Sequence, residues 1–328
     1  MDTIDFVLTW VDGNDPEWQA EKRKYKPSSD SDDGINRYLD WENLQYWFRA
    51  VEKFAPWVNK IHFVTAGHIP KWLNTNNPKL NIVKHSDYIP SEYLPTFSSH
   101  PIELNIHRIK GLSENFVYFN DDTFLNAPVK PENFFKDGKP VDQLIFDIAY
   151  PSREQISKIV YNNYELISKY TTKRFLYKNA FSKLFYPFYG LVGLKNYFLL
   201  PFQHFTGFYN HHLPISFCKS IYCEMWEKEY DALNETSLRK FRDNADVSPW
   251  AIRYLNLSRG NIVPASYNQG KIFAITNSNE KLYKAISKSK YRMICCNDAG
   301  EYDDFQKQKQ NLINIFDKKL PEKSSFEI

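Results

Sequence analysis

The stretch FVYFNDDTFL, residues 116–125, constrains the fold more than any other part of the chain. Its four consecutive apolar residues are typical of a strand that is buried on both faces, as in the parallel sheets of α/β proteins. Asn120, Asp121 and Asp122 follow where such a strand would leave the sheet. Adjacent carboxylates repel each other and lose hydration when partly buried, unless a positive group lies beside them. The stretch therefore predicts an α/β sheet with a cation or an arginine at its edge.

Strand-like and helix-like segments alternate through the first half of the 328-residue chain. Asp15 and Pro16 are typical of a helix start, so the DGND turn joins a strand to a helix. Expected strands are 4–11, 60–67, 81–85 and the strand before Asn120; expected helices are 16–25, one from about Asp40, and one from about Ser99 to Lys110. This βαβ series predicts an α/β, Rossmann-type sheet flanked by helices.

The composition changes after about residue 150, which suggests three parts. We expect residues 1–150 to form the main α/β part, 151–210 a mostly helical, basic and aromatic insertion or lid, and 211–328 a C-terminal part that completes the domain. The last part should contain a helix from about Pro214 to Tyr230, a strand at RMICC and a terminal helix. The aromatic stretch 181–202 is broken by Lys and Pro, so it fits a membrane surface, a lid or ordinary core.

Charge and cysteine content exclude some classes of protein. The chain has 42 Lys and Arg against 39 Asp and Glu, a net charge of +3, which is too balanced for a general nucleic-acid binder. Four cysteines do not make a disulfide framework at this length. The N-terminus lacks a signal-peptide pattern, and no apolar run is long enough to span a membrane. We therefore expect a cytoplasmic protein, with peripheral contact to the inner face of the membrane as an open alternative.

Acidic residues follow three of the expected strands: Asp12, the pair Asp121 and Asp122, and Asp298 after Asn297. Any one of them could be a simple turn cap, but three together favour a ligand site, because strand ends in open α/β sheets share one crevice. Carboxylate and amide oxygens suit Mg²⁺ or Mn²⁺. Zinc fits less well, because the neighbouring cysteines 295 and 296 lack the usual ligand spacing.

Histidines supply the candidate bases. On the expected helix after Ser99, His100, Glu103 and His107 share one face. This face is solvated, binds a metal, for which the spacing alone is a weak signal, or supplies a phosphate-facing base with Arg108 as a clamp. His212 precedes an expected helix, whose positive end would lower the histidine pKa. No P-loop or GxGxxG motif is present, so nucleotide binding by those routes is not supported.

Four blocks of the sequence resemble the Stealth family of sugar-1-phosphate transferases, which includes bacterial capsule enzymes and the N-acetylglucosamine-1-phosphotransferase of lysosomal targeting. The blocks begin with IDFVLTWVDGNDPEW, with RYLDWENLQYWF and its continuation through NDDTFLNAPV, with HLPISFCKSIYC, and with RMICCNDAGEYDD. The resemblance implies a fold similar to GT-A nucleotide-sugar transferases. It also implies transfer of a sugar 1-phosphate from a UDP-sugar to a hydroxyl of an oligosaccharide or polysaccharide acceptor, lipid-linked in some cases.

The resemblance also suggests roles for particular residues. The donor loop would contain Asp12, phosphates would be met by Arg37 and Arg108, and the essential acid pair would be Asp121 and Asp122. The third block contributes His212 and Arg242, and the fourth contributes Asn297 with Asp298. Two departures are visible: Ile215 stands where some relatives have a second histidine, and Ala299 replaces a polar residue. The first puts more weight on His212, and the second leaves the metal ligands open.

These observations define one expected reaction and two rivals. The acid pair would hold the cation that neutralises the phosphate charge and the leaving UMP, and His212, with His107 second, would take the acceptor proton. A GT-A glycosyltransferase would use the same fold and metal but release UDP. A carbohydrate-binding module would use the many aromatic residues without a phosphate-neutralising site.

Overall fold

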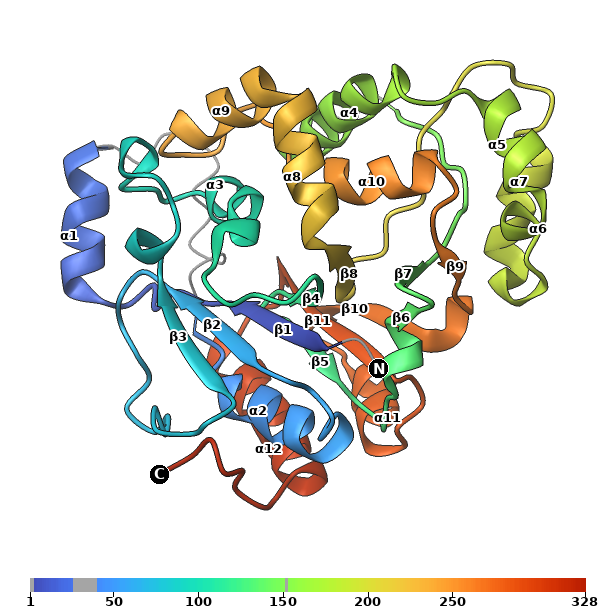
Figure 1. The fold of residues 1–328 in the computed structure, drawn as a ribbon. Helices are drawn as coiled ribbons and strands as arrows, with labels where there is room; N and C mark the ends of the chain where they lie inside the picture. The colour runs from blue at the N-terminus through green and yellow to red at the C-terminus, as the bar shows by residue number, and fades with distance from the viewer. Residues whose placement is uncertain (1–2, 26–39, 151–152) are drawn as a thin grey trace.

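The computed structural model describes residues 3–25, 40–150 and 153–328, and its main element is a five-stranded sheet (Figure 1). The strand order is β3-β2-β1-β4-β8. The first four strands are parallel, and β8 pairs antiparallel with β4. The strands are β1 (Ile4–Thr9), β2 (Ile61–Thr65), β3 (Leu80–Lys84), β4 (Asn115–Phe119) and β8 (Ile215–Cys218). The α/β sheet predicted from the apolar runs is therefore confirmed.

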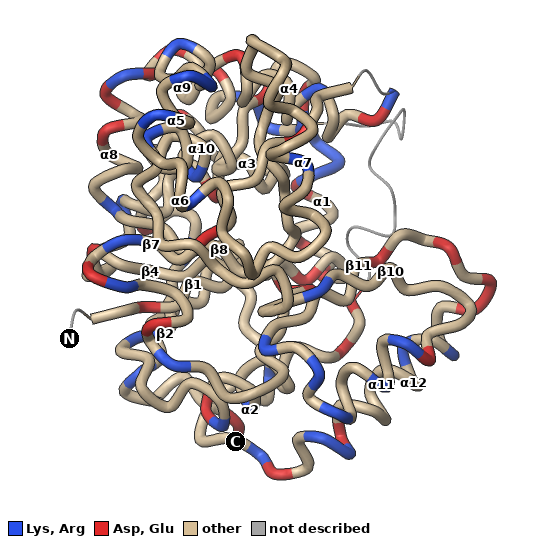
Figure 2. Tube along the Cα trace, turned by 90° about the vertical axis from the view of Figure 1, so that its right-hand side faces the viewer, with Lys and Arg blue, Asp and Glu red and all other residues tan. Residues whose placement is uncertain are grey.

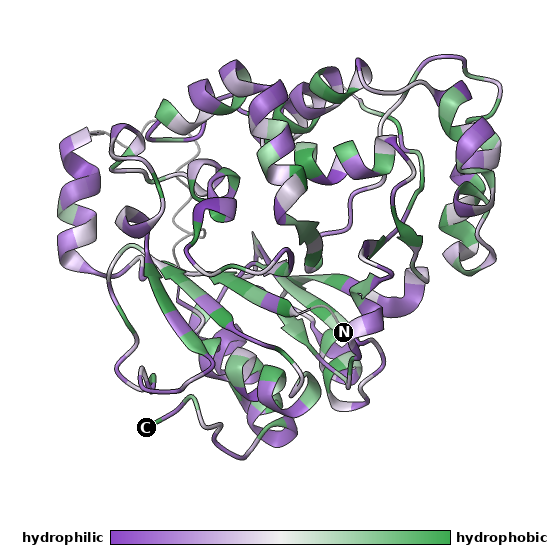
Figure 3. Ribbon diagram, in the orientation of Figure 1, coloured by the Kyte–Doolittle hydropathy of each residue, from purple (hydrophilic) through white to green (hydrophobic). Residues whose placement is uncertain are grey.

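The central strands are buried on both faces, as the FVYF run predicts. Phe6 and Phe119 pack on one side, in a core shared with α2 (Leu44–Phe54), α11 (Glu280–Ser287) and α12 (Phe305–Lys319). Val7 and Phe116 pack on the other side, in a core shared with α3 (Ser99–Leu104), α4 (Gln155–Ser168), α8 (Lys219–Lys228), α9 (Tyr230–Leu238) and α10 (Trp250–Ser258). Figure 1 shows the two helical layers, and Figure 3 shows the apolar strands between them. Helices that cover both faces explain why these strands lack a polar alternation.

A second sheet lies beside the acid pair. It has the order β10-β11-β5, with β5 (Thr123–Leu125) antiparallel to β11 (Met293–Glu301) and β10 (Gly270–Thr276) parallel to it. Because β5 follows β4 directly, residues 120–122 form the turn between the two sheets. The turn is fixed by hydrogen bonds from Thr123 N to Asn120 O (3.1 Å) and from Cys296 N to Asp122 O (2.8 Å).

The remaining elements include a small sheet and most of the helices. The small sheet contains β6 (Phe135–Lys136), β7 (Lys139–Asp142) and β9 (Val263–Pro264). The other helices are α1 (Pro16–Tyr25), α3 (Ser99–Leu104), α4 (Gln155–Ser168), α5 (Lys173–Asn179), α6 (Phe181–Leu184), α7 (Leu194–Phe198), α8 (Lys219–Lys228), α9 (Tyr230–Leu238) and α10 (Trp250–Ser258). Short 3₁₀ segments are η2 (His85–Asp87), η3 (Ser91–Tyr93), η4 (Ile106–Arg108), η5 (Pro131–Asn133), η6 (Pro187–Gly193) and η7 (Tyr267–Gln269).

Two predicted helices differ in the structure. The helix expected from Ser99 to Lys110 ends at Leu104 and continues as η4, because the Asn105 side chain donates to Pro101 O (2.8 Å) and interrupts the helical pattern. The helix expected from Pro214 begins only at Lys219, because the preceding residues form β8 on the free edge of β4. By contrast, α1 has the predicted bounds, and Asp15 caps it by accepting from Trp18 N (2.8 Å).

Charged residues of both signs are spread over much of the described chain (Figure 2), as the balanced composition predicts. Residues 153–207 contain helices and no strand in the part of the chain that the structure describes, as expected for a helical insertion. Within the same described ranges, no helix is both long enough and apolar enough to cross a bilayer.

Candidate active site

The acidic residues gather where the parallel strands β1 and β4 end. Asp12 lies just beyond β1, and the turn 120–122 lies just beyond the neighbouring β4. Desolvation by neighbouring groups, and then the negative charges of Asp122 and Asp40, raise the pKa of Asp121. Its side chain nevertheless keeps contact with solvent. The pKa of Asp40 is raised by burial and then by the charges of Glu42 and Asp12. This surplus of negative charge is the environment expected of a cation site.

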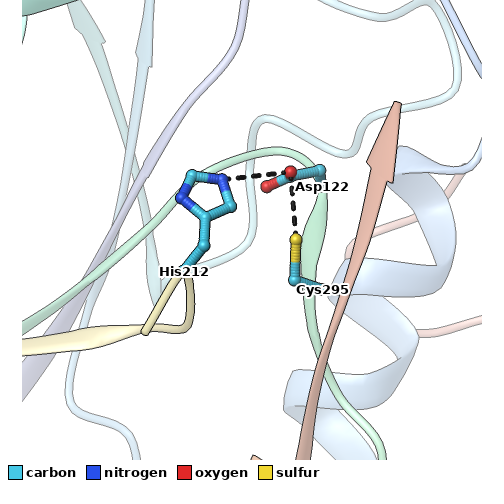
Figure 4. Close-up of side chains that lie close together, drawn as sticks. All are labelled: Asp122, His212 and Cys295. Carbon is cyan, nitrogen blue, oxygen red and sulfur yellow. Dashed lines mark hydrogen bonds and ion pairs between the residues drawn. The ribbon is translucent and has the colours of Figure 1, made fainter. Parts of the chain in front are cut away.

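Asp122 forms a compact cluster with His212 and Cys295 (Figure 4). Its Oδ2 lies 3.2 Å from His212 Nε2 and 3.2 Å from Cys295 Sγ. One ligand atom from each of the three side chains lies within 4.8 Å of the others. The other oxygen, Oδ1, is buried and accepts no hydrogen bond from any residue that the structure describes. An unpartnered buried carboxylate oxygen is costly unless a cation or a ligand meets it.

The carboxylates around His212 set its protonation. Burial lowers the pKa of His212, but the nearby carboxylates, above all Asp122, raise it by more, so the net pKa lies above the ordinary value. The prediction of a lowered pKa at a helix start is therefore wrong, because β8 and not a helix follows His212. Burial, and then the charge of Asp122, raise the pKa of Cys295, so this thiol stays protonated and donates to the carboxylate.

A buried ion pair holds the segment that leads to His212. Arg253 of α10 makes a two-bond contact with Asp142 at the end of β7, with Nε–Oδ2 at 2.7 Å and Nη2–Oδ1 at 2.8 Å. Arg253 also donates to Tyr209 O (3.1 Å), and His211 Nε2 lies 3.2 Å from Asp142 Oδ1. Both ends of the segment 209–211 are therefore fastened just before the catalytic candidate. Planar two-bond contacts of this kind fix geometry as well as charge.

A small pocket opens beside the cluster. Its lining combines an acid, an amide and aromatic side chains, contributed by Glu103, Tyr118, Asn120, His212, Leu213, Ile215, Pro249 and Trp250. Tyr118 is fixed by a 2.9 Å hydrogen bond to Thr9 Oγ1. Asn120 Nδ2 lies 3.4 Å from His212 Nε2. The pocket therefore places polar groups beside His212.

Three of the predicted residues lie away from the cluster, in or near α3 and η4. His107 is buried against the rings of Tyr222 and Trp226, and burial lowers its pKa to about 3. Arg108 is exposed, stacks on Trp226 and donates to Asn105 Oδ1 (2.9 Å). Arg242 donates to Ser99 Oγ (2.8 Å) near the start of α3. The two histidines of the face expected between residues 100 and 107 are therefore part of the core, with His100 also buried, 3.1 Å from Asp246. Glu103 of the same face lines the pocket instead.

The fourth sequence block covers β11, and its side chains divide between the two faces of the strand. Cys295 faces Asp122, and Asn297, two residues along the strand, is expected on the same face. Asp298 belongs to the other face, where Trp41 Nε1 donates to it (3.2 Å) and Tyr302 donates to both of its oxygens. Asp12 accepts from Asn14 N (2.9 Å) in its own turn, and its N–H donates to His68 Nε2 (2.7 Å). Arg37 lies outside the described residues.

Several site residues were not singled out from the sequence. In the sequence, Asp40 indicates only the start of a helix. Cys295 is not a candidate ligand there, because its spacing to Cys296 argues against a zinc site. Asp142 and Arg253 are 111 residues apart, so no local pattern reveals their pairing. The one sequence signal for a buried ion pair was the presence of polar residues, Arg253 among them, within the otherwise apolar helix α10.

Two stretches of the chain match sequence models of one protein family. A sequence model described as Stealth protein conserved region 1 matches residues 2–30, and one described as conserved region 2 matches residues 37–142. Among solved structures, the galactosyltransferase LgtC in complex with donor and acceptor sugar analogs aligns with 96% of this chain and 95% of its own, at 9% identity and a TM-score of 0.41.

Full-length relatives extend the match to the whole chain. The chain is 47% identical over 330 residues to the capsular polysaccharide phosphotransferase WcwK of Streptococcus pneumoniae, covering 100% of this chain and 98% of that protein. It is 40% identical over 334 residues to the receptor polysaccharide phosphotransferase WefC of Streptococcus oralis, with 100% of both chains covered. This chain therefore belongs to the Stealth family. It is an enzyme of the phosphotransferase class.

Proposed function

We propose that this enzyme transfers a sugar 1-phosphate from a UDP-sugar to a hydroxyl of a saccharide acceptor and releases UMP. The acceptor we propose is a lipid-linked oligosaccharide or polysaccharide, used on the cytoplasmic side of the membrane in the synthesis of a capsule or another surface polysaccharide. The names of the capsular and receptor polysaccharide relatives support this class of substrate. The observation that carries the proposal is the contact between Asp122 and His212 in the midst of other carboxylates.

We propose Mg²⁺ or Mn²⁺ as the cofactor, held by Asp121 and Asp122 with help from Asn297. The donor set fits, because Asp122 Oδ1 is buried without a described partner and the neighbouring acids have raised pKa values. Asp298 would reach the ion only by giving up its bonds to Trp41 and Tyr302, so we assign it a supporting role. When bound, the cation would neutralise charge on the phosphate oxygens and the leaving nucleotide.

We propose His212 as the base. The acceptor oxygen would form a bond to the sugar-bearing phosphorus, and the bond between that phosphorus and the oxygen of UMP would break. The hydroxyl proton would pass to His212, whose Nε2 is held by Asp122 and whose Nδ1 is left for the proton. Asp122 would stabilise the imidazolium that forms. Because the sugar C1–O bond stays intact, the anomeric configuration is retained in the product.

The test separates this reaction from that of a GT-A glycosyltransferase. The enzyme is incubated with acceptor and a UDP-sugar that carries a label in the sugar-linked phosphate. Our proposal predicts label in the saccharide product and UMP as the nucleotide released. Label that leaves wholly as UDP would show cleavage at C1 and contradict the proposal. A panel of UDP-sugars and saccharides, with products identified by mass spectrometry, then shows which donor and acceptor are used.

A non-catalytic carbohydrate-binding role is the second candidate, favoured only by the abundance of aromatic residues. A binding module has no need of a cation beside a histidine base. Turnover that disappears on treatment with a chelator and returns with Mg²⁺ or Mn²⁺ would exclude it.

A further inference from the structure

The helical lobe, residues 170–204, exposes a concentration of large apolar side chains. Nine of the nineteen large apolar side chains that are exposed among the described residues lie between residues 175 and 202. They are Phe175, Phe181, Phe188, Leu191, Leu194, Tyr197, Phe198, Leu200 and Phe202. Leu191 is 85% exposed and Phe198 is 74% exposed. Concentrated exposure of this kind on a folded chain marks an interaction surface.

The exposure does not come from a loosely attached segment. Leu176, Leu184 and Leu199 of the lobe are buried in the core. Asn196 accepts from Phe146 N (2.7 Å) and donates to Leu144 O (3.0 Å). The lobe is therefore anchored by one set of residues, while another set remains in water. Figure 1 shows α5, α6 and α7 together at one side of the molecule.

The lobe carries charge of one sign. No Asp or Glu occurs between Glu165 and Glu224, whereas five Lys and Arg lie within the lobe: Lys173, Arg174, Lys178, Lys183 and Lys195. Arg174 and Lys178 are exposed next to Phe175. The other three are tied to the protein: Lys173 donates to Phe202 O, Lys183 to Gly260 O and Lys195 to Asp147. Figure 2 shows basic segments on α5, α6 and α7.

We propose that the helical lobe docks on an anionic lipid bilayer. Aromatic and leucine side chains beside Lys and Arg are the composition of surfaces that lie in the headgroup region of a membrane. A second copy of the chain fits less well, because two lobes without acidic residues would repel each other where they met. A neutral saccharide would not require the bias in charge. The polar tip of Tyr197 and the cations of Arg174 and Lys178 suit the boundary between lipid and water.

Docking would have a consequence for the proposed reaction, and only this step rests on the proposed function. The chain runs from the lobe through residues 205–211 to His212, and Tyr209 to His211 are fastened by Arg253 and Asp142. The lobe and the candidate base are therefore linked by a short, fixed segment. A membrane-bound lobe would keep the site close to an acceptor that is anchored in the same bilayer.

The test is sedimentation of the whole protein with vesicles, without substrates. We expect binding to vesicles of phosphatidylcholine and phosphatidylglycerol, and weaker binding to phosphatidylcholine alone. The combined substitution Phe188→Ser, Leu191→Ser and Phe198→Ser should weaken binding to the mixed vesicles about tenfold or more, because three membrane-inserted groups are lost. Replacing Arg174 and Lys178 by Gln should weaken binding only where the lipid is anionic, by roughly fivefold per charge.

Tyr230→Ser with Ile272→Ser is the matched control, because both side chains are exposed but lie outside the lobe. This control should bind as the wild type does, and melting curves should show that all variants are folded. Equal binding by the wild type and the triple variant would overturn the proposal. The proposal would also be overturned if the wild type did not bind vesicles and its molar mass in light scattering differed from that of the triple variant. That result would assign the lobe to contact between copies of the chain. None of these outcomes bears on the reaction with labelled donor.

Discussion

The two oxygens of Asp122 have different surroundings. Oδ2 lies close to both His212 and Cys295, while Oδ1 is buried without a partner among the described residues. One carboxylate can therefore orient the proposed base, His212, through one oxygen and offer the other to a cation. This division of contacts explains how the Asp122 carboxylate keeps its position although it is adjacent to Asp121. It also makes Asp122 the residue whose substitution is most informative.

Asp122→Asn keeps the size of the side chain but removes one negative charge from the proposed cation site. We expect a loss of turnover on the order of 10³-fold or more, because the lost interaction acts mainly in the transition state. The melting temperature without metal should be unchanged or higher, since repulsion between the paired acids is relieved. Turnover across a Mg²⁺ or Mn²⁺ titration, beside melting curves, is the measurement. Near-normal activity, or a large fall in melting temperature, would indicate a structural role.

Cys295→Ser and Cys295→Ala test the hydrogen bond to Asp122. Serine keeps a donor and should leave turnover with Mg²⁺ within a few-fold of the wild type, whereas alanine leaves Asp122 with one donor fewer and should cost about tenfold. Sulfur, nitrogen and oxygen ligands together suit zinc, so Zn²⁺ should inhibit the wild type and inhibit Cys295→Ser much less. Activity is measured against added Zn²⁺. Cys223→Ser is the control, because Cys223 is exposed and should not alter zinc sensitivity.

At the scale of elements, the pair of Asp142 and Arg253 joins β7 to α10. Arg253→Gln leaves the Asp142 carboxylate buried and without its full partner, so we expect a loss of about 3–5 kcal/mol in the free energy of unfolding. Arg259→Gln is the control, because the bridge from Arg259 to Glu224 is partly exposed and should be worth less than about 1 kcal/mol. Urea unfolding of both variants gives the comparison. Similar losses in the two would show that burial does not set the value of the pair.

Asp5 in β1 provides a dependence of stability on pH. Burial alone would raise its pKa, but hydrogen bonds from His62, Asn59 and Ser113 outweigh burial and lower the pKa below the ordinary value of 3.8. A lowered pKa adds stability that is fully present above the ordinary value and is lost as the pH falls through the folded value. The difference in unfolding free energy between the wild type and Asp5→Asn should be constant near neutral pH and shrink below about pH 4. A difference that is independent of pH would contradict this assignment.

Local sequence patterns predicted the elements whose burial is continuous along the chain. The FVYF run predicted β4, and the helix expected from about Asp40 corresponds to α2, whose buried face includes Leu44, Trp47, Phe48 and Val51. Residues 215–218 were assigned to a helix because their partner, β4, lies about a hundred residues earlier. The sequence offered the acid pair and His212 as candidates, but the contact of Asp122 with Cys295 depends on pairing across 173 residues. Local periodicity carries no information about such pairing.

At the scale of the whole molecule, the last described residues pack on the first half of the chain. Phe326 is 2% exposed and packs against Phe48, while Glu327 makes a two-bond contact with Arg49. Phe326→Ala should therefore cost about 3–5 kcal/mol of unfolding free energy. Phe198→Ala, at a side chain that is 74% exposed, should change it by less than about 0.5 kcal/mol. Denaturant unfolding checks both, and a small effect at Phe326 would show that this segment is not part of the cooperative core.

The separation between β5 and β11 affects how the protein emerges from the ribosome. β5 follows the acid turn directly, but the strand that pairs with it contains Cys295, 173 residues after Asp122. At synthesis rates of roughly 5–20 residues per second, β5 would wait about 9–35 s for this partner. During that time an apolar strand edge stays open to wrong partners, so a slowly translated or truncated chain should aggregate. The same delay means that Asp122 acquires its full set of contacts only when synthesis is nearly over.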